Sequence, residues 1–222
     1  MRFDIETLDA DGALRETAEA AAGDTRARFL AKAGLLGGGL VGSAALLTPE
    51  VADAARRGGR KGDVAILNYA LTLEYLEAAF YTRAERKGAL SGELALFAEV
   101  VGAHERAHVK ALKQVLGRKA VARPRFDFQG TTEDAGQFAA TAQVLEDTGV
   151  AAYAGQAPKV KADAILEAAL AIHSVEARHA GWIRDISGED PAPEAFDEPL
   201  TKKQVLAAVG ATGFIVPRRR GG

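Results

Sequence analysis

The stretch HERAH, residues 104–108, has two interpretations that predict different folds and different chemistry. As H-E-x-x-H on a helix, it would place two histidines one turn apart to hold a single zinc ion, with the glutamate as a general base. As E-x-x-H, it would be one half of a site for two metal ions in a helical bundle, and the first histidine would only be a neighbour. The rest of the chain distinguishes the two.

A second E-x-x-H motif, EARH at residues 176–179, favours the two-metal interpretation. At about 100° per residue, positions i and i+3 of a helix lie on one face, so the glutamate and histidine of each motif can reach the same ion. All the histidines of the chain fall in the two segments that carry these motifs. They are His104, His108, His173 and His179.

Each motif also has a partner glutamate in the segment before it. The pairs are Glu74 with Glu105, 31 residues apart (105 − 74), and Glu146 with Glu176, 30 residues apart (176 − 146). A tyrosine lies seven residues after each partner glutamate, Tyr81 in one case and Tyr153 in the other. The same arrangement therefore occurs twice, and two antiparallel helix pairs meeting face to face would gather four carboxylates and two imidazoles.

Hydrophobic residues recur at spacings of three and four in four segments, which predicts four amphipathic helices. The predicted helices are residues 63–87, 92–116, 133–155 and 159–187. Gly88, Gly117 and Gly188 are suited to end helices, and Ser91 is suited to cap the second one. The connections are short, long and short, with the long one at residues 118–132. The sequence thus predicts an all-α four-helix bundle with one long crossover between its second and third helices.

The bundle is predicted to occupy residues 55–188, with a different kind of sequence on either side. Residues 189–222 read as an extension that packs on the bundle: a short helix at 201–209, an apolar end at Phe214, Ile215 and Val216, and a basic tail at Arg218–Arg220. Residues 1–54 read as an export signal or disordered segment. Arg26, Arg28 and Lys32 precede an uncharged stretch, and Ala52-Asp53-Ala54 offers a cleavage site.

The stretch TRARFLAK at residues 25–32 also resembles a twin-arginine export signal, but Ala27 stands where the second arginine belongs. Export to the periplasm, cell envelope or exterior is the expectation, and a membrane would be contacted only through an uncleaved signal. The net charge of −2 gives no general electrostatic case for nucleic acid. The absence of cysteine excludes thiolate metal sites and cysteine nucleophiles.

The segment LNYALTLEYLEAAFY (67–81), the HERAH helix and the FDF crossover (126–128) together resemble the ferritin-like superfamily. The resemblance is to exported ferritin-like-domain proteins of the group that includes plant desiccation-related proteins, and it covers roughly residues 62–216. It implies a site for two iron ions, or manganese, held by six residues. Carried over position by position, these are Glu74, Glu105, His108, Glu146, Glu176 and His179.

Several residues near these positions have alternative interpretations. Glu77 lies one turn from Glu74 and is an alternative ligand on the same helix. His104 and His173 either orient the carboxylates from behind or are ordinary, partly buried histidines. Tyr81 and Tyr153 are either redox-active or part of the core.

The resemblance implies a protein that reacts Fe(II) with dioxygen or peroxide, as a ferroxidase or peroxide-consuming oxidoreductase in iron, oxidative or desiccation stress. A non-catalytic, stress-related structural or binding bundle is the alternative. A zinc metalloprotease is a third hypothesis, carried only by the H-E-x-x-H match. A homodimer formed through a helix face is a further expectation.

Overall fold

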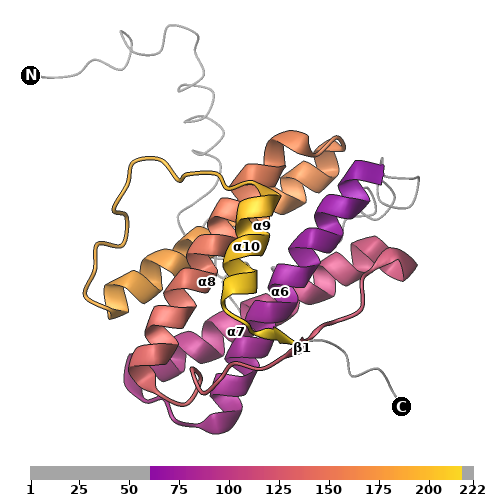
Figure 1. Cartoon of the computed structure of the whole chain (residues 1–222). Helices are drawn as coiled ribbons and strands as arrows, with labels where there is room; N and C mark the ends of the chain where they lie inside the picture. Colours follow the sequence, from indigo (N-terminus) through magenta and orange to yellow (C-terminus); the bar gives the residue numbers. More distant parts are fainter. Residues whose placement is uncertain (1–60, 217–222) are drawn as a thin grey trace, which may run out of the picture. The chain divides into compact units, whose positions relative to one another are not determined.

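The computed structural model of the chain describes residues 61–216, which form a bundle of four long helices with a smaller strap (Figure 1). The predicted export signal at residues 25–54 and the arginine tail lie outside the described residues. Within this part of the chain, no helix combines the length and hydrophobicity needed to cross a membrane. The long helices are α6 (Lys61–Lys87), α7 (Gly92–Leu116), α8 (Ala135–Gln156) and α9 (Asp163–Ile186).

This arrangement confirms the all-α prediction and its long crossover between the second and third helices. Helix α6 packs chiefly on α7, and α8 packs chiefly on α9. Three starts of the long helices differ from the prediction. Helix α6 begins at Lys61, two residues earlier than predicted. Helix α8 begins after Asp134, whose side chain accepts a hydrogen bond from the Gln137 backbone at 2.8 Å and caps the helix. Helix α9 begins at Asp163 rather than Lys159, because a 3-10 turn containing Pro158 precedes it.

The crossover and the C-terminal segment meet in a two-stranded antiparallel ladder that the sequence did not predict. Strand β1 (Arg125–Phe126) pairs with β2 (Ile215–Val216). The hydrogen bond from the Asp127 backbone to the Phe214 carbonyl, at 2.9 Å, extends this contact. The long connection is thereby held to residues 214–216 of the C-terminal segment.

The strap helix α10 (Lys202–Ala211) packs across α8 and α6. Thr201 and Gln204 form a reciprocal capping box at its start. Thr201, predicted as the first residue of this helix, is therefore its cap, and the helix begins at Lys202. Its buried residues, Val205 and Val209, join the main core. Close approach to α8 depends on Gly155, where an added Cβ would lie 1.9 Å from the Leu200 carbonyl oxygen.

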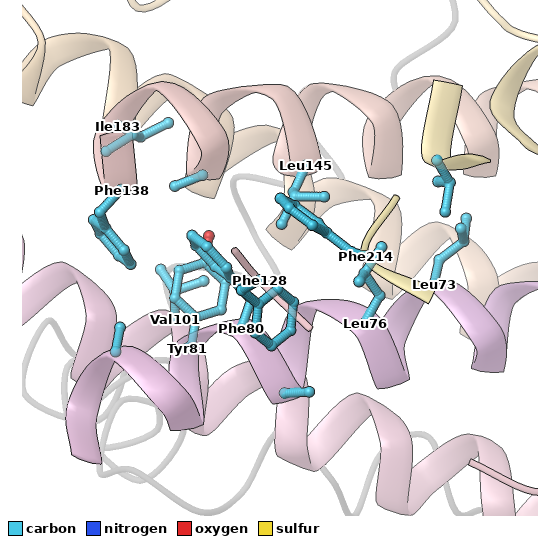
Figure 2. Packing of buried hydrophobic residues seen from close by; sticks show 14 of the residues in the cluster. Leu73, Leu76, Phe80, Tyr81, Val101, Phe128, Phe138, Leu145, Ile183 and Phe214 are labelled. Carbon is cyan, nitrogen blue, oxygen red and sulfur yellow. The ribbon is translucent and has the colours of Figure 1, made fainter. Parts of the chain in front are cut away.

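Aromatic and aliphatic side chains from the long helices, the crossover, α10 and the C-terminal segment form the larger hydrophobic core, part of which Figure 2 shows. Phe80 and Phe138 stack with ring centroids 5.1 Å apart, and both are fully buried. Tyr81 packs edge-on against Phe80 and Phe97. The core therefore holds the Tyr81 ring in place beside the middle of the bundle, where the polar site lies.

Candidate metal centre

Four buried glutamates and two buried histidines meet in the interior of the bundle, and every long helix contributes to them. Their exposed fractions are small: 1% for Glu74, and 0% for Glu105, Glu146 and Glu176. His108 is 7% exposed and His179 is 3% exposed. Charged side chains are almost never buried to this extent unless they are paired or bind a cation. Helix α6 carries Glu74, α7 carries Glu105 and His108, α8 carries Glu146, and α9 carries Glu176 and His179.

These side chains form two overlapping groups of four, each able to hold one metal ion. The ligand atoms in each group all lie within 4.8 Å of one another. Glu105 and Glu176 belong to both groups, so the two groups share these carboxylates. The first group is completed by Glu74 and His108, and the second by Glu146 and His179.

Both histidines turn Nδ1 toward the carboxylates. His108 Nδ1 lies 3.1 Å from Glu74 Oε2, 3.3 Å from Glu105 Oε2 and 3.1 Å from Glu176 Oε1. His179 Nδ1 lies 3.1 Å from Glu146 Oε2 and 3.3 Å from Glu105 Oε1. One nitrogen of each imidazole is therefore available to an ion between the carboxylates.

The two tyrosines that repeat in the sequence hold the two glutamates that belong to only one group each. Tyr81 on α6 donates a hydrogen bond to Glu146 Oε1 on α8. Tyr153 on α8 donates one to Glu74 Oε1 on α6. Both phenols are buried and have raised pKa values because of burial and the adjacent carboxylates, so they remain donors. Sequence reasoning recorded the repeated seven-residue spacing but missed that each tyrosine bonds the glutamate of the opposite helix.

The cluster carries more negative charge than its histidines balance. Burial raises the pKa of Glu74 to about 7, and burial and neighbouring carboxylates raise that of Glu176 well above its ordinary value. Burial alone would lower the pKa of His179, but Glu146 and Glu105 beside it raise it to about 10. Metal-free, this interior must therefore retain protons that bound cations would displace.

Unpartnered oxygen atoms provide a direct test of whether the residues fit metal ions. Glu105 Oε1 and both oxygens of Glu176 are buried and accept no well-aligned hydrogen bond in the described chain. Two of these oxygens do face imidazoles: Glu176 Oε1 lies 3.1 Å from His108 Nδ1, and Glu105 Oε1 lies 3.3 Å from His179 Nδ1. These are the two carboxylates shared by both groups. Carboxylate oxygen with imidazole nitrogen is a ligand set suited to iron and manganese. The donor set, its burial and its unsatisfied atoms all fit two divalent ions.

The structure separates the residues with alternative interpretations. Glu77 is 3% exposed and lies beside the cluster, but it belongs to neither group of four, whereas Glu74 does. His104 contacts a histidine rather than a carboxylate: its Nδ1 is 2.9 Å from His179 Nε2. His173 is only partly buried, its Nδ1 has no hydrogen-bond partner in the described chain, and no contact joins it to the cluster.

The single-zinc interpretation of HERAH requires His104 and His108 to share an ion while Glu105 stays free as a base. Neither group of four contains His104, and Glu105 belongs to both. The geometry therefore supports E-x-x-H as the metal-binding motif. His104 lies beside His179, the histidine of the second E-x-x-H motif.

A small apolar cavity of about 40 Å³ adjoins the cluster along the bundle interior. Its lining includes Ala70, Leu73, Ala111 and Ile172, each one turn or less from a residue of the cluster. Tyr153 is common to both, because its ring lines the cavity and its hydroxyl bonds Glu74. Tyr69 and Gln156 also line the cavity. The Tyr69 hydroxyl and Gln156 Nε2 are buried without a hydrogen-bond partner in the described chain. The sequence contained no signal for this cavity.

Comparison with known proteins identifies one family. Residues 62–189, more than half of the chain, match the family model described as a ferritin-like domain. The match covers all four long helices and every residue of the cluster. No curated protein matches the chain.

Proposed function

The chain belongs to the ferritin-like domain family, and from this premise we propose that it is a di-metal carboxylate protein that oxidises Fe(II) with dioxygen or peroxide. The observation that carries the proposal is the sharing of Glu105 and Glu176 by two adjacent groups of ligands. Burying these carboxylates costs several kcal/mol each unless charges compensate them, and in the cluster two histidines face four glutamates, so bound cations would supply the missing positive charge.

In this proposal Glu74 and His108 would hold one ion, Glu146 and His179 would hold the other, and Glu105 and Glu176, which belong to both groups, would serve both. Two ferrous ions together supply two electrons, which with two protons reduce dioxygen to hydrogen peroxide or hydrogen peroxide to two waters. Manganese is the alternative metal. The protein's part is to supply fixed negative charge, to keep bulk water out, and to leave room for a small oxidant.

The tyrosines have a positioning function in the proposal rather than a redox one. Each phenol fixes one terminal carboxylate through a hydrogen bond that spans the bundle. A glutamate held at one oxygen keeps the other directed at the histidine and the ion. Because both phenols have strongly raised pKa values, they donate this bond throughout the physiological pH range.

The cavity beside Tyr153 favours dioxygen as the oxidant. Its wall is mostly apolar, and its volume of about 40 Å³ suits a diatomic molecule. Hydrogen peroxide needs several hydrogen-bond partners, whereas dioxygen needs none and partitions into apolar surroundings. Export through the signal-like residues 25–54 and a role in iron or oxidative stress are parts of the same proposal that rest on the sequence alone.

Metal analysis of the full chain tests the proposal. The metal-free protein is loaded with Fe(II) under anaerobic conditions, desalted and analysed for iron, and then exposed to dioxygen while Fe(III) absorbance is followed. We expect about two irons per chain, one for each group of ligands, and their oxidation on mixing. Substitution of both shared glutamates, Glu105→Ala with Glu176→Ala, should abolish both results.

The matched control replaces two exposed glutamates on the same helices, Glu99→Ala on α7 and Glu167→Ala on α9. It should bind and oxidise iron as the unmutated chain does. Absence of bound metal in the unmutated protein would refute the proposal and leave a stress-related structural bundle as the better hypothesis. One zinc per chain retained through iron loading would instead support the single-zinc interpretation.

A further inference from the structure

We propose that a basic pocket between the end of helix α6 and the crossover binds a compact polyanion, a soluble oligophosphate. None of its lining residues belongs to the metal cluster, so the inference goes beyond the proposed function and does not depend on it. The pocket is an open hollow of about 400 Å³. Five of its nine lining residues are cationic and none is acidic. The cations are Arg83, Arg86, Lys87, Arg123 and Arg125.

The five cations come from two segments that are far apart in the sequence. Arg83, Arg86 and Lys87 lie near the end of α6, whereas Arg123 and Arg125 belong to the crossover. Basic residues are common in the last turn of a helix, because they balance the partial negative charge of its end. That explanation covers Arg86 and Lys87 but neither arginine of the crossover. The convergence of both segments on one hollow distinguishes the basic pocket from an ordinary helix end.

Little of this positive charge is neutralised by neighbouring acids. Arg83 and Lys87 share one carboxylate, Glu133, whose Oε1 lies 3.4 Å from Arg83 Nη2 and 2.7 Å from Lys87 Nζ. The other three lining cations form no ion pair with any residue that the structure describes. Asp127 in the crossover instead accepts a hydrogen bond from the Gln129 backbone at 3.0 Å. Because the clustered cations repel one another, an anion bound among them would be stabilised by all of them.

The donors of the basic pocket favour phosphate groups in a ligand with several charges. Guanidinium groups present N–H donors in one plane and bind phosphate oxygens through paired hydrogen bonds. Arg83 and Arg86 are one helical turn apart, so they can contact adjacent phosphate groups. Arg123 lies over the Phe126 ring, with Cζ 5.3 Å from its centroid, which positions the guanidinium while leaving its N–H donors free to bind. The concave shape suits a compact soluble anion better than a flat membrane surface.

Calorimetric titration of the full-length chain with tripolyphosphate tests the proposal. Metal ions are removed first, because they would bind the probe themselves. We expect one molecule bound per chain, with an affinity that falls at high salt because salt screens the charges. Orthophosphate should bind more weakly, because it can reach fewer of the cations. Arg86→Gln with Arg125→Gln, a change at two exposed positions, should weaken tripolyphosphate binding about tenfold or more without changing the Tm.

The matched control is Lys110→Gln with Lys113→Gln, which removes the same charge from the exposed face of α7. It should change the affinity by less than about twofold, because distant surface charges are screened. If the Arg86–Arg125 variant does not fold, Arg86→Glu alone reverses a charge at an exposed position and should cause a similar loss.

Equal weakening in the control and in the pocket variant would indicate a general effect of charge and would overturn the site. Failure of the unmutated chain to bind tripolyphosphate would also overturn it. So would binding to vesicles of phosphatidylcholine with phosphatidylglycerol in place of tripolyphosphate, because the surface would then recognise a membrane. None of these outcomes bears on the metal centre, whose ions are measured separately.

Discussion

The hydroxyl group of Tyr153 on α8 donates a hydrogen bond to Glu74 Oε1 on α6, joining a core aromatic ring to a carboxylate of the metal centre across the bundle. The bond from Tyr81 on α6 to Glu146 on α8 runs the opposite way. Each of these helices thus orients the terminal glutamate of the other. The packing of α6 on α8 and the geometry of the centre therefore depend on each other.

Replacing this donor tests the dependence. Tyr153→Phe should weaken metal binding at the Glu74–His108 position about tenfold, because the carboxylate loses the group that orients it. It should also lower the free energy of unfolding by about 1–3 kcal/mol, because a buried carboxylate oxygen is left without its donor. Metal titration and chemical denaturation measure the two effects.

Tyr75→Phe is the control for Tyr153→Phe. Tyr75 is a buried α6 residue whose hydroxyl makes no hydrogen bond in the described part of the chain, so its loss should affect neither quantity by much. If Tyr153→Phe and Tyr75→Phe bind metal equally well, the cross-bundle bond has no positioning function.

The metal-free protein should become less stable as the pH rises. The pKa of Glu74, ordinarily 4.5, is raised to about 7 by burial, so the folded state holds a proton that the unfolded state releases between these values. His179, ordinarily near 6.5, is raised to about 10 by the surrounding carboxylates despite its burial, and its contribution is lost over the range up to pH 10. Both effects lower the stability from pH 5 to pH 8.

Thermal unfolding in the presence of a chelator measures this trend, with an expected fall of several degrees in Tm between pH 5 and pH 8. Saturating metal should reverse it, because ions displace these protons and bind better as the pH rises. A metal-free Tm that is constant or increases over this range would show that ionisation of the buried carboxylates does not destabilise the folded state.

The spacing of hydrophobic residues predicted the helices, and the paired E-x-x-H motifs with their partner glutamates predicted which residues meet at the centre. A spacing of three residues decides which side chains share one helix face. The interval from Glu74 to Glu105 decides which residue of the antiparallel neighbour lies opposite Glu74. The start of α8 was placed two residues too early, because the sequence pattern did not reveal that the Asp134 side chain caps the helix through the Gln137 backbone.

Features that depend on contacts across the bundle were not predictable in the same way. The seven-residue spacing of Tyr153 from Glu146 did not indicate its partner, because its hydroxyl bonds Glu74 on another helix. Glu77 and Gly149 are unremarkable in their own helices, although a Cβ at residue 149 would lie 3.3 Å from Glu77 Oε1. The β1–β2 ladder joins segments about ninety residues apart, beyond the reach of any local pattern.

His104 tests whether a hydrogen bond to the far side of the His179 ring strengthens metal binding by that histidine. With Nδ1 of His179 directed at the carboxylates, its Nε2–H is placed to donate to His104 Nδ1, 2.9 Å away. His104→Ala should leave two metal ions per chain but weaken the one at His179 by about 10–100-fold. His173→Ala is the matched control on α9 and should bind both ions normally. Equal affinities in the two variants would make His104 an ordinary partly exposed histidine.

The strap should detach when its contact with α8 is blocked. Gly155→Ala places a Cβ where the Leu200 carbonyl oxygen lies, 1.9 Å away, so residue 200 must move and lose its backbone hydrogen bond to Ala151. We expect a lower Tm and faster proteolysis within residues 189–201. Gly210→Ala in α10 meets no atom within 4 Å and should be neutral or stabilising by about 0.4–1 kcal/mol. Equal proteolysis of the two variants would mean that the strap is not held through Gly155.

Filling the cavity should distinguish dioxygen from peroxide as the oxidant. Ala70→Leu adds a branched side chain to the wall of a cavity of about 40 Å³ and should abolish xenon binding there. Because the metal ligands are untouched, Fe(II) binding and oxidation by hydrogen peroxide should persist, whereas oxidation by dioxygen should slow several-fold. Ala103→Leu adds the same group on the exposed face of α7 and should leave xenon binding and both rates unchanged. If Ala70→Leu excludes xenon but the dioxygen rate is unaffected, dioxygen reaches the metal ions by another route, and the cavity has no part in the reaction.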